Sequence, residues 1–354
     1  MAEITNTLSG GLADGSSGVI SGAKAGRRTD LNVETLRGLA CLLLVGFHVV
    51  GGKPYTGLRV EDPDSIYRLV TDALAYLRMP LFTFLSGYVY AMRPFSGGAG
   101  RFMQGKVRRL LVPMLVVGTL FAILKSVAPG TNTPMALEDF LTLHIVPVEH
   151  FWYVESLFWI FLLVMLLEMG GLLSTGRRFI AVMAIGCVIH VLYQKPPIYL
   201  GFAGAIYLIP FFLFGAACNR FRETLFRPTV LWPAGLLFVL CGTWALMGVA
   251  GLTARVPDQS VPALVIGCCS GLFLLASQWK VRWLVFIGGF SYSIYIYHVF
   301  AAAPSRIILE KLGVTDTFLL LVVGLVCGIV APIIVDRVAS RYGWSRLVLL
   351  GKRR

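Results

Sequence analysis

Ten apolar stretches, each close in length to a membrane-spanning helix, dominate this sequence. They cover residues 33–50, 69–92, 109–128, 151–170, 178–194, 199–218, 229–250, 260–279, 283–304 and 316–336. A helix needs about 20 apolar residues to cross the hydrocarbon core of a bilayer. Since 57% of the 354 residues are hydrophobic and only 14% are charged, the composition excludes a soluble globular domain. We therefore predict an all-α polytopic membrane protein with about ten transmembrane helices.

Basic residues between these stretches predict the orientation. Segments on one side of the predicted membrane hold 21 of the 31 Lys and Arg residues, and segments on the other side hold 8. Basic residues are enriched on the cytoplasmic side of membrane proteins, so both termini are predicted to be cytoplasmic. The same rule explains the net charge of +13 without a nucleic-acid partner. We expect membrane lipid to surround the protein. The sequence does not determine whether the chain forms a homo-oligomer.

The chain divides by composition into three parts. Residues 1–30 are rich in Gly, Ser, Ala and Thr and are predicted to be a disordered cytoplasmic segment. Residues 31–340 form the predicted transmembrane domain, and residues 341–354 form a basic cytoplasmic tail. The seven cysteines lie in or beside apolar stretches, and none forms a pair of CxxC motifs. Neither a disulfide framework nor a metal site is therefore expected.

The first stretch carries two ionisable residues, Arg37 and His48, eleven positions apart. Eleven residues are close to three helical turns, so both side chains share one helix face, separated by roughly 16 Å along the axis. Ionisable groups inside a span are costly and normally face a protein interior or a wet cavity. A histidine exchanges protons near neutral pH, so His48 is a candidate base. The alternative is an interfacial arginine with a histidine satisfied by packing.

The second stretch places Arg78 inside the apolar sequence YLRMPLFTFLSGY, with Pro80 and the pair Ser86-Gly87 following it. The proline opens the helical hydrogen-bond ladder, and the small pair allows close helix approach. Arg78 is a candidate cation for an anionic or oxyanionic group. The alternative is that its long side chain reaches the outer interface.

A basic cluster precedes the third stretch, in the sequence RFMQGKVRRLLVP. Its members are Arg101, Lys106, Arg108 and Arg109. Such a cluster can bind phosphates by charge and by bidentate hydrogen bonds. The positive-inside rule alone would also produce it.

The fourth stretch opens with EHFWYVESLFW. Trp152 suits an interfacial aromatic belt, whereas Glu155 lies inside the span, where an acid usually has a partner or a role. Glu149 and His150 lie at the edge of the stretch and are interpreted as ordinary loop residues.

The ninth stretch contains Ser291, Tyr295 and His298 at spacings of four and three residues, which predicts one polar stripe on a helix. The alternative is simple hydrogen bonding between helices. A second intramembrane histidine at a depth similar to that of His48 favours a shared site. His144 and His190 are interpreted as structural.

Taken in order, these motifs resemble the acyltransferase-3 family of bacterial membrane proteins over about residues 31–336. The most specific element is an Arg, ten residues and a His in the first helix. PLFTFLSGY, RRLLVP, FWYVESLFW and FSYSIYIYH are similar to further family motifs.

The resemblance implies transfer of an acyl group, acetyl or succinyl, from cytoplasmic acyl-CoA to a hydroxyl of an extracytoplasmic sugar or polysaccharide. The expected location is the bacterial inner membrane. His48 would be the base, and Arg37 would belong to the donor path. Apart from the resemblance, the chemistry of the side chains predicts that Arg78 or His298 stabilises the oxyanion. Arg78, as a cation facing the cavity, would favour a dicarboxylic acyl group such as succinyl. The residues implied to shape the substrate site are Ser86, Trp152, Glu155, Ser291 and Tyr295. Those implied to bind CoA phosphates are Arg101, Lys106, Arg108 and Arg109.

Two other classes remain open from the sequence. A proton-coupled transporter or flippase of a polysaccharide precursor also uses intramembrane histidine and arginine. The absence of a visible inverted repeat counts mildly against it. A non-catalytic subunit of a polysaccharide export machine would not need Arg37 and His48 on one face.

Overall fold

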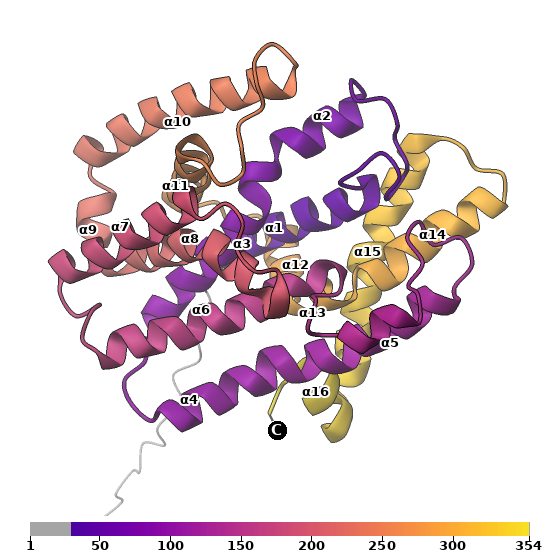
Figure 1. Cartoon of the computed structure of the whole chain (residues 1–354), viewed down its shortest axis with the longest axis horizontal. Helices are drawn as coiled ribbons and strands as arrows, with labels where there is room; N and C mark the ends of the chain where they lie inside the picture. Colours follow the sequence, from indigo (N-terminus) through magenta and orange to yellow (C-terminus); the bar gives the residue numbers. More distant parts are fainter. Residues whose placement is uncertain (1–29, 354) are drawn as a thin grey trace, which may run out of the picture. The chain divides into compact units, whose positions relative to one another are not determined.

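Helices make up the regular secondary structure of this chain in a computed structural model that describes residues 30–353 (Figure 1). The first half contains α1 (Leu31–Val50), α2 (Ile66–Ala73), α3 (Ala75–Met92), α4 (Ala99–Lys106), α5 (Val112–Val127), α6 (Trp152–Met169), α7 (Gly176–Leu192) and α8 (Phe202–Arg220). The second half contains α9 (Arg222–Leu225), α10 (Pro228–Val249), α11 (Val261–Ala276), α12 (Arg282–Gly288), α13 (Ser291–Tyr297), α14 (Val299–Lys311), α15 (Thr317–Ala339) and α16 (Gly343–Leu350). Residues 1–29 of the predicted N-terminal segment lie outside the described residues.

Among the described residues, six helical segments are long and apolar enough to cross a membrane. They are Leu31–Val50, Ala99–Val127, Glu149–Met169, Tyr199–Arg220, Pro228–Val249 and Thr317–Ala339. The all-α prediction is confirmed. The predicted count of about ten spans and the cytoplasmic position of both termini are not confirmed by these helices.

Two of the predicted spans are interrupted. The stretch 69–92 divides at Leu74 into α2, which carries polar residues, and α3, which holds Pro80 in its interior. The stretch 283–304 divides into α12, α13 and α14, with its main turn at Gly289 and Phe290. A pair of glycines at 288 and 289 favours the end of a helix there.

Apolar side chains cover much of the outer surface. On α10, Trp232 is 80% exposed, and Leu236, Val239 and Leu240 are also exposed. Large contiguous apolar patches are rare on proteins surrounded by water. These helix faces are therefore suited to contact with lipid, as expected for a membrane protein.

Glycines allow two helix pairs to cross with their backbones in contact. A Cβ on Gly38 of α1 would overlap the carbonyl oxygen of Leu284 in α12, and one on Gly288 would overlap the carbonyl oxygen of Glu34. The α3–α8 crossing is built in the same way from Gly87 and Gly215. The predicted close approach at Ser86-Gly87 is thus confirmed.

Beyond the turn at residues 289–290, α13 and α14 run beside α1 in the same direction. The Cys41 Sγ lies 3.9 Å from the Ser291 carbonyl oxygen. Seven residues further along both segments, the rings of His48 and His298 have centroids 4.7 Å apart. Seven residues advance a helix by about 10 Å, so the two segments run parallel and stay in contact over that length.

The segment α4–α5 is continuous but contains a π-helical turn, Val107–Leu111, just before Pro113. A proline lacks the N–H that would bond the carbonyl four residues earlier, which favours such a local widening. The predicted basic tail contains helix α16, whose Leu350 is buried. At the end of α16, Gly351 lies against the backbone of Arg108 and Arg109, so the tail packs onto the π-helical turn.

We predict that Gly38→Ala destabilises the protein, because the new methyl group has no space against the backbone of α12. Overpacking of this kind costs about 1–3 kcal/mol. The matched control is Gly242→Ala in α10, where no neighbouring atom of the described residues lies within 4 Å of an added Cβ. Thermal unfolding of both variants in detergent measures the difference. Equal unfolding temperatures for the two variants would contradict the crossing described above.

Candidate functional site

Three histidines from distant parts of the chain meet in the interior. His48 lies near the end of α1, His150 lies in the 3₁₀ turn Glu149–Phe151 that leads into α6, and His298 lies between α13 and α14. The ring centroids of His48 and His298 are 4.7 Å apart, those of His150 and His298 are 4.8 Å apart, and those of His48 and His150 are 5.7 Å apart. One ring nitrogen from each histidine lies within 4.8 Å of the other two.

Backbone carbonyls determine the tautomer of the first two rings. The Nδ1 of His48 is 3.0 Å from the carbonyl oxygen of Leu44. The Nε2 of His150 is 3.4 Å from the carbonyl oxygen of Ile296. A carbonyl oxygen can only accept, so these nitrogens carry the hydrogen and donate it. The other nitrogen of each neutral ring then carries a lone pair.

The third ring is held in the same way. The Nδ1 of His298 is 2.9 Å from the carbonyl oxygens of both Ile294 and Tyr295, so it also donates and leaves Nε2 as an acceptor. His298 is fully buried, and His150 is 3% exposed. The buried His298 Nε2 and His150 Nδ1 have no hydrogen-bond partner among the described residues. The cluster therefore combines three proton acceptors with no protein group to donate to them.

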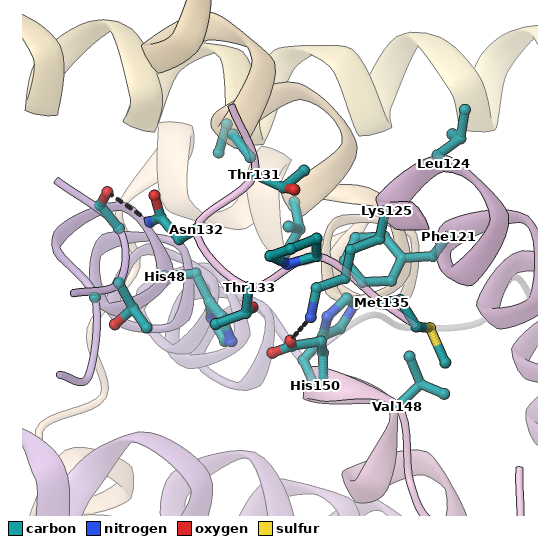
Figure 2. A pocket seen from close by; sticks show the side chains of 18 of the residues that line it. His48, Phe121, Leu124, Lys125, Thr131, Asn132, Thr133, Met135, Val148 and His150 are labelled. Atoms are coloured by element: carbon teal, nitrogen blue, oxygen red, sulfur yellow. Dashed lines mark hydrogen bonds and ion pairs between the residues drawn. The ribbon is translucent and has the colours of Figure 1, made fainter. Parts of the chain in front are cut away.

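A cavity of about 740 Å³ adjoins this cluster and is lined by His48, His150, Phe47 and Trp152. Figure 2 shows His48 and His150 in its wall, with the loop residues Thr131–Met135 close by. An ion pair between Lys125 and Glu149 lies beside His150. The cavity thus gives access to the His48–His150 side of the cluster, while His298 lies behind them.

Aromatic and hydroxyl groups connect the predicted residues Ser86 and Tyr295 to the cluster. The Tyr295 hydroxyl donates to the carbonyl oxygen of His150. The rings of Tyr295 and Tyr153 have centroids 5.2 Å apart, and the Tyr153 hydroxyl lies 3.5 Å from Ser86 Oγ. Tyr295 therefore supports the turn that carries His150, and Ser86 lies further from the histidines.

Arg78 is not among the residues that line the cavity. Its guanidinium lies 3.9 Å from the centroid of the Phe47 ring, and it donates to the carbonyl oxygen of Thr71 at 2.6 Å. No carboxylate pairs with Arg78 in the described part of the chain. Phe47 lines the cavity, so this cation lies one aromatic ring away from it.

Arg37, Glu155 and Ser291 lie outside the cavity lining. Arg37 forms an ion pair of 2.7 Å with Glu34, one turn earlier in α1. Glu155 is buried, and its two carboxyl oxygens have no partner among the described residues. Ser291 meets Cys41 through its backbone carbonyl. The structure brings neither Arg37 nor Ser291 to the histidine rings.

A second cavity brings together the four basic residues predicted to bind phosphate. It has a volume of about 970 Å³ and is lined by Arg101, Lys106, Arg108 and Arg109, together with residues of the C-terminal segment. The residues that the C-terminal segment adds include Trp344, Lys352 and Arg353. In the described residues no acidic side chain lines this cavity.

The two cavities lie at opposite ends of α5. The basic cavity reaches Val112, and the cavity beside the histidines begins at Phe121 and includes Leu124 and Lys125. Nine residues of helix separate Val112 from Phe121, which corresponds to about 14 Å. A basic site and a histidine site therefore face opposite ends of one apolar helix.

His150 is the residue that sequence reasoning missed. It lies at the edge of an apolar stretch, where loop residues are usual, and it reaches His48 only because a 3₁₀ turn directs it inward. Its position directly before Phe151 and Trp152 was the available signal. By contrast, the predicted pairing of His48 with His298 matches the structure.

His144 has a separate environment, with Nε2 at 2.9 Å from Thr119 Oγ1, and burial lowers the pKa of its ring.

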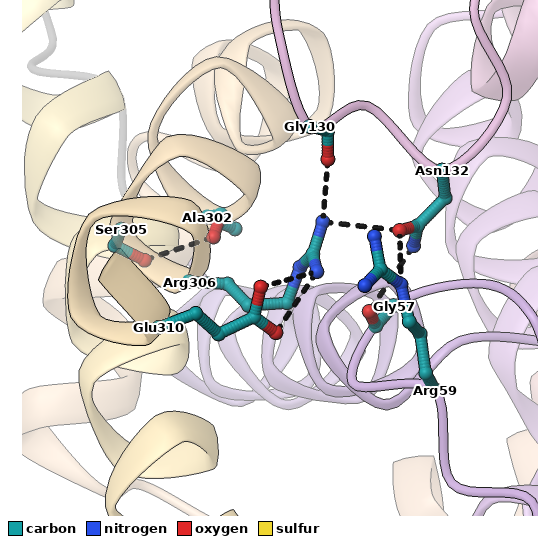
Figure 3. A network of polar contacts seen from close by, with 8 residues as sticks. All are labelled: Gly57, Arg59, Gly130, Asn132, Ala302, Ser305, Arg306 and Glu310. Carbon is teal, nitrogen blue, oxygen red and sulfur yellow. Dashed lines mark hydrogen bonds and ion pairs between the residues drawn. The ribbon is translucent and has the colours of Figure 1, made fainter. Parts of the chain in front are cut away.

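A polar network ties the loop over the cavity to α14 (Figure 3). Arg306 donates to both carboxyl oxygens of Glu310 at 3.0 Å, to the carbonyl of Gly130 and to Asn132 Oδ1. Arg59 donates to the same Asn132 oxygen at 2.8 Å. Arg306 is 5% exposed and lines the cavity, so this buried side chain holds the loop at Gly130 and Asn132 against α14.

One of three comparisons with known proteins gives a match. A family model described as an acyltransferase domain, acyltransferase-3, matches residues 30–337. Comparisons with curated proteins and with solved structures give no match. The matched range includes all three histidines and all four basic residues of the predicted phosphate site.

We predict that Arg306→Ala loosens the loop around Asn132 and costs about 1.5–3 kcal/mol, the contribution typical of charged hydrogen bonds. Hydrogen exchange of the backbone amides at residues 130–137 should become faster. The control is Arg59→Ala, which removes an exposed partner of the same Asn132 oxygen and should cost less than about 0.5 kcal/mol. Equal acceleration by both variants would show that Arg306 is not the anchor.

Proposed function

The chain belongs to the acyltransferase-3 family, and we propose that it transfers an acyl group across the membrane from acyl-CoA to a sugar hydroxyl. A membrane acyltransferase is the general activity that the family supports. The acyl group is acetyl or succinyl, and the acceptor is an extracytoplasmic sugar or polysaccharide. The membrane is the bacterial inner membrane, with the basic cavity on its cytoplasmic side.

The histidine cluster is the observation that carries this proposal. Nε2 of His48 has no hydrogen-bond partner in the described region, its ring borders the cavity, and its tautomer is held by the Leu44 carbonyl. A general base must present an unprotonated nitrogen to the hydroxyl whose proton it takes. His48 meets this requirement.

The reaction follows from this arrangement. The acceptor hydroxyl gives its proton to Nε2 of His48 while its oxygen forms a bond with the thioester carbonyl carbon. The carbon–sulfur bond then breaks, and the CoA thiolate leaves and takes the proton from His48. His150 and His298 keep the His48 ring in position through their edge contacts.

Arg78 is the better of the two candidates to stabilise the developing oxyanion. The Nδ1–H of His298 already donates to two backbone carbonyls, so a neutral His298 has no donor to offer. Arg78 has no carboxylate partner among the described residues and lies against Phe47 at the cavity wall. The same cation would favour a dicarboxylic acyl group such as succinyl.

The basic cavity supports CoA as the donor. Several cations face one space without an acid among the described lining residues, an arrangement that attracts a polyphosphate. Because the two cavities lie at opposite ends of α5, this position fits a donor that enters from one side and an acceptor that enters from the other. Arg37 would then lie on the donor side, as part of the α1 face that leads to His48.

We predict that His48→Ala lowers the rate of acyl transfer by at least about 100-fold, the range expected for the loss of a general base. Purified protein in liposomes is given labelled acetyl-CoA or succinyl-CoA and a lipid-linked sugar acceptor. Thioester consumption and labelled product are both measured, and the preferred thioester identifies the acyl group.

The control is His144→Ala, which removes a histidine outside the cluster and should keep the wild-type rate. Transfer that continues normally in His48→Ala would contradict the base role. If wild-type protein consumes neither thioester, the donor assignment is wrong and the transporter or flippase interpretation takes its place.

A further inference from the structure

Each ring of the histidine cluster keeps one nitrogen with a lone pair, because a backbone carbonyl oxygen accepts the N–H of the other nitrogen in His48, His150 and His298. One ring nitrogen of each histidine lies within 4.8 Å of the other two. Two of the acceptor nitrogens, His150 Nδ1 and His298 Nε2, are buried without a partner among the described residues. Buried acceptors are unfavourable unless a hydrogen-bond donor or a cation satisfies them.

These hydrogen bonds to carbonyl oxygens are those that metal-binding histidines make. A histidine that ligates a metal almost always donates its other N–H to a carbonyl, a carboxylate or water, which sets the tautomer and the ring orientation. All three rings of this cluster have a carbonyl in that position. His190 provides the contrast within the same chain. Its Nδ1 also meets a carbonyl oxygen, but among the described residues it belongs to no such group of potential ligands.

The donor set selects the kind of metal. Three neutral imidazole nitrogens suit zinc, cobalt, nickel and copper, whereas magnesium and calcium prefer oxygen ligands. Three protein ligands with one open position are typical of a zinc site that a further ligand can reach. Here the cavity beside His48 and His150 provides that access.

We propose that His48, His150 and His298 together bind one divalent transition-metal ion, of the zinc type. This site rests on the histidine geometry and does not depend on the acyl-transfer proposal. Its consequence for catalysis rests on the proposed function. A lone pair of His48 Nε2 that is bound to a metal cannot accept a proton, so the bound metal holds the enzyme inactive.

The test uses full-length protein in detergent, freed of metal with a chelator and titrated with cobalt(II). Wild-type protein is expected to bind about one cobalt ion per chain, with the intense visible absorption of tetrahedral cobalt, and zinc should displace it. His150→Ala and His298→Ala should each weaken cobalt binding by at least about 10-fold, because even the loss of a supporting group near a metal has that effect.

Two control variants make the result specific. His144→Ala and His190→Ala remove histidines outside the cluster and should bind cobalt as the wild type does. Because His298 is fully buried, its alanine variant could fail to fold. His48→Ala therefore serves as the second variant, since its ring lies at the cavity. Thermal unfolding of each metal-free variant establishes that it is folded. Cobalt binding that is absent, or unchanged in folded His48→Ala and His150→Ala protein, would overturn the proposal.

Zinc added to the transfer assay separates this proposal from the proposed function. If zinc inhibits the wild type and a chelator reverses the inhibition, the result supports both the metal site and the base role of His48. Stimulation by zinc together with histidine-dependent cobalt binding would keep the metal site and overturn the base role of His48. Histidine-independent cobalt binding with intact acyl transfer would overturn the metal site alone.

Discussion

The contact between the backbones of α1 and α12 determines where the chemistry of this protein lies. Gly38 and Gly288 have no side chain to separate the two helices, so the turn that follows at residues 289–290 places α13 directly beside α1. The two segments then advance together from the Cys41–Ser291 contact to the meeting of His48 and His298. The position of one histidine against the other is therefore a consequence of a helix crossing ten residues earlier in each segment.

Backbone carbonyls set the orientation of the histidine rings that the helix crossing brings together. Each of the three rings gives its N–H to a carbonyl oxygen, so each keeps one nitrogen with a lone pair. These lone pairs are available to a hydroxyl proton, and the same property makes the cluster attractive to a metal ion. Catalysis and metal binding compete for one nitrogen of His48, and the adjoining cavity admits either ligand.

Periodicity and composition were sufficient to predict an all-α membrane protein and the pairing of His48 with His298. The four basic residues before α5 were also correctly grouped, because they lie close together in sequence. The sequence could not show that residues 283–304 would turn at 289–290, since apolar periodicity continues through that point. It also could not show that a 3₁₀ turn brings His150 inward, or that α16 closes the basic cavity. Both depend on contacts between segments far apart in the chain.

The central claim is that donor and acceptor meet at the histidine cluster from opposite sides of the membrane. The most direct measurement uses sealed liposomes with the protein in one orientation, acyl-CoA trapped inside and the sugar acceptor only outside. The account predicts labelled product outside when the basic cavity faces the trapped acyl-CoA, and none when the orientation is reversed. Product formed only when both substrates are on the same side would contradict it.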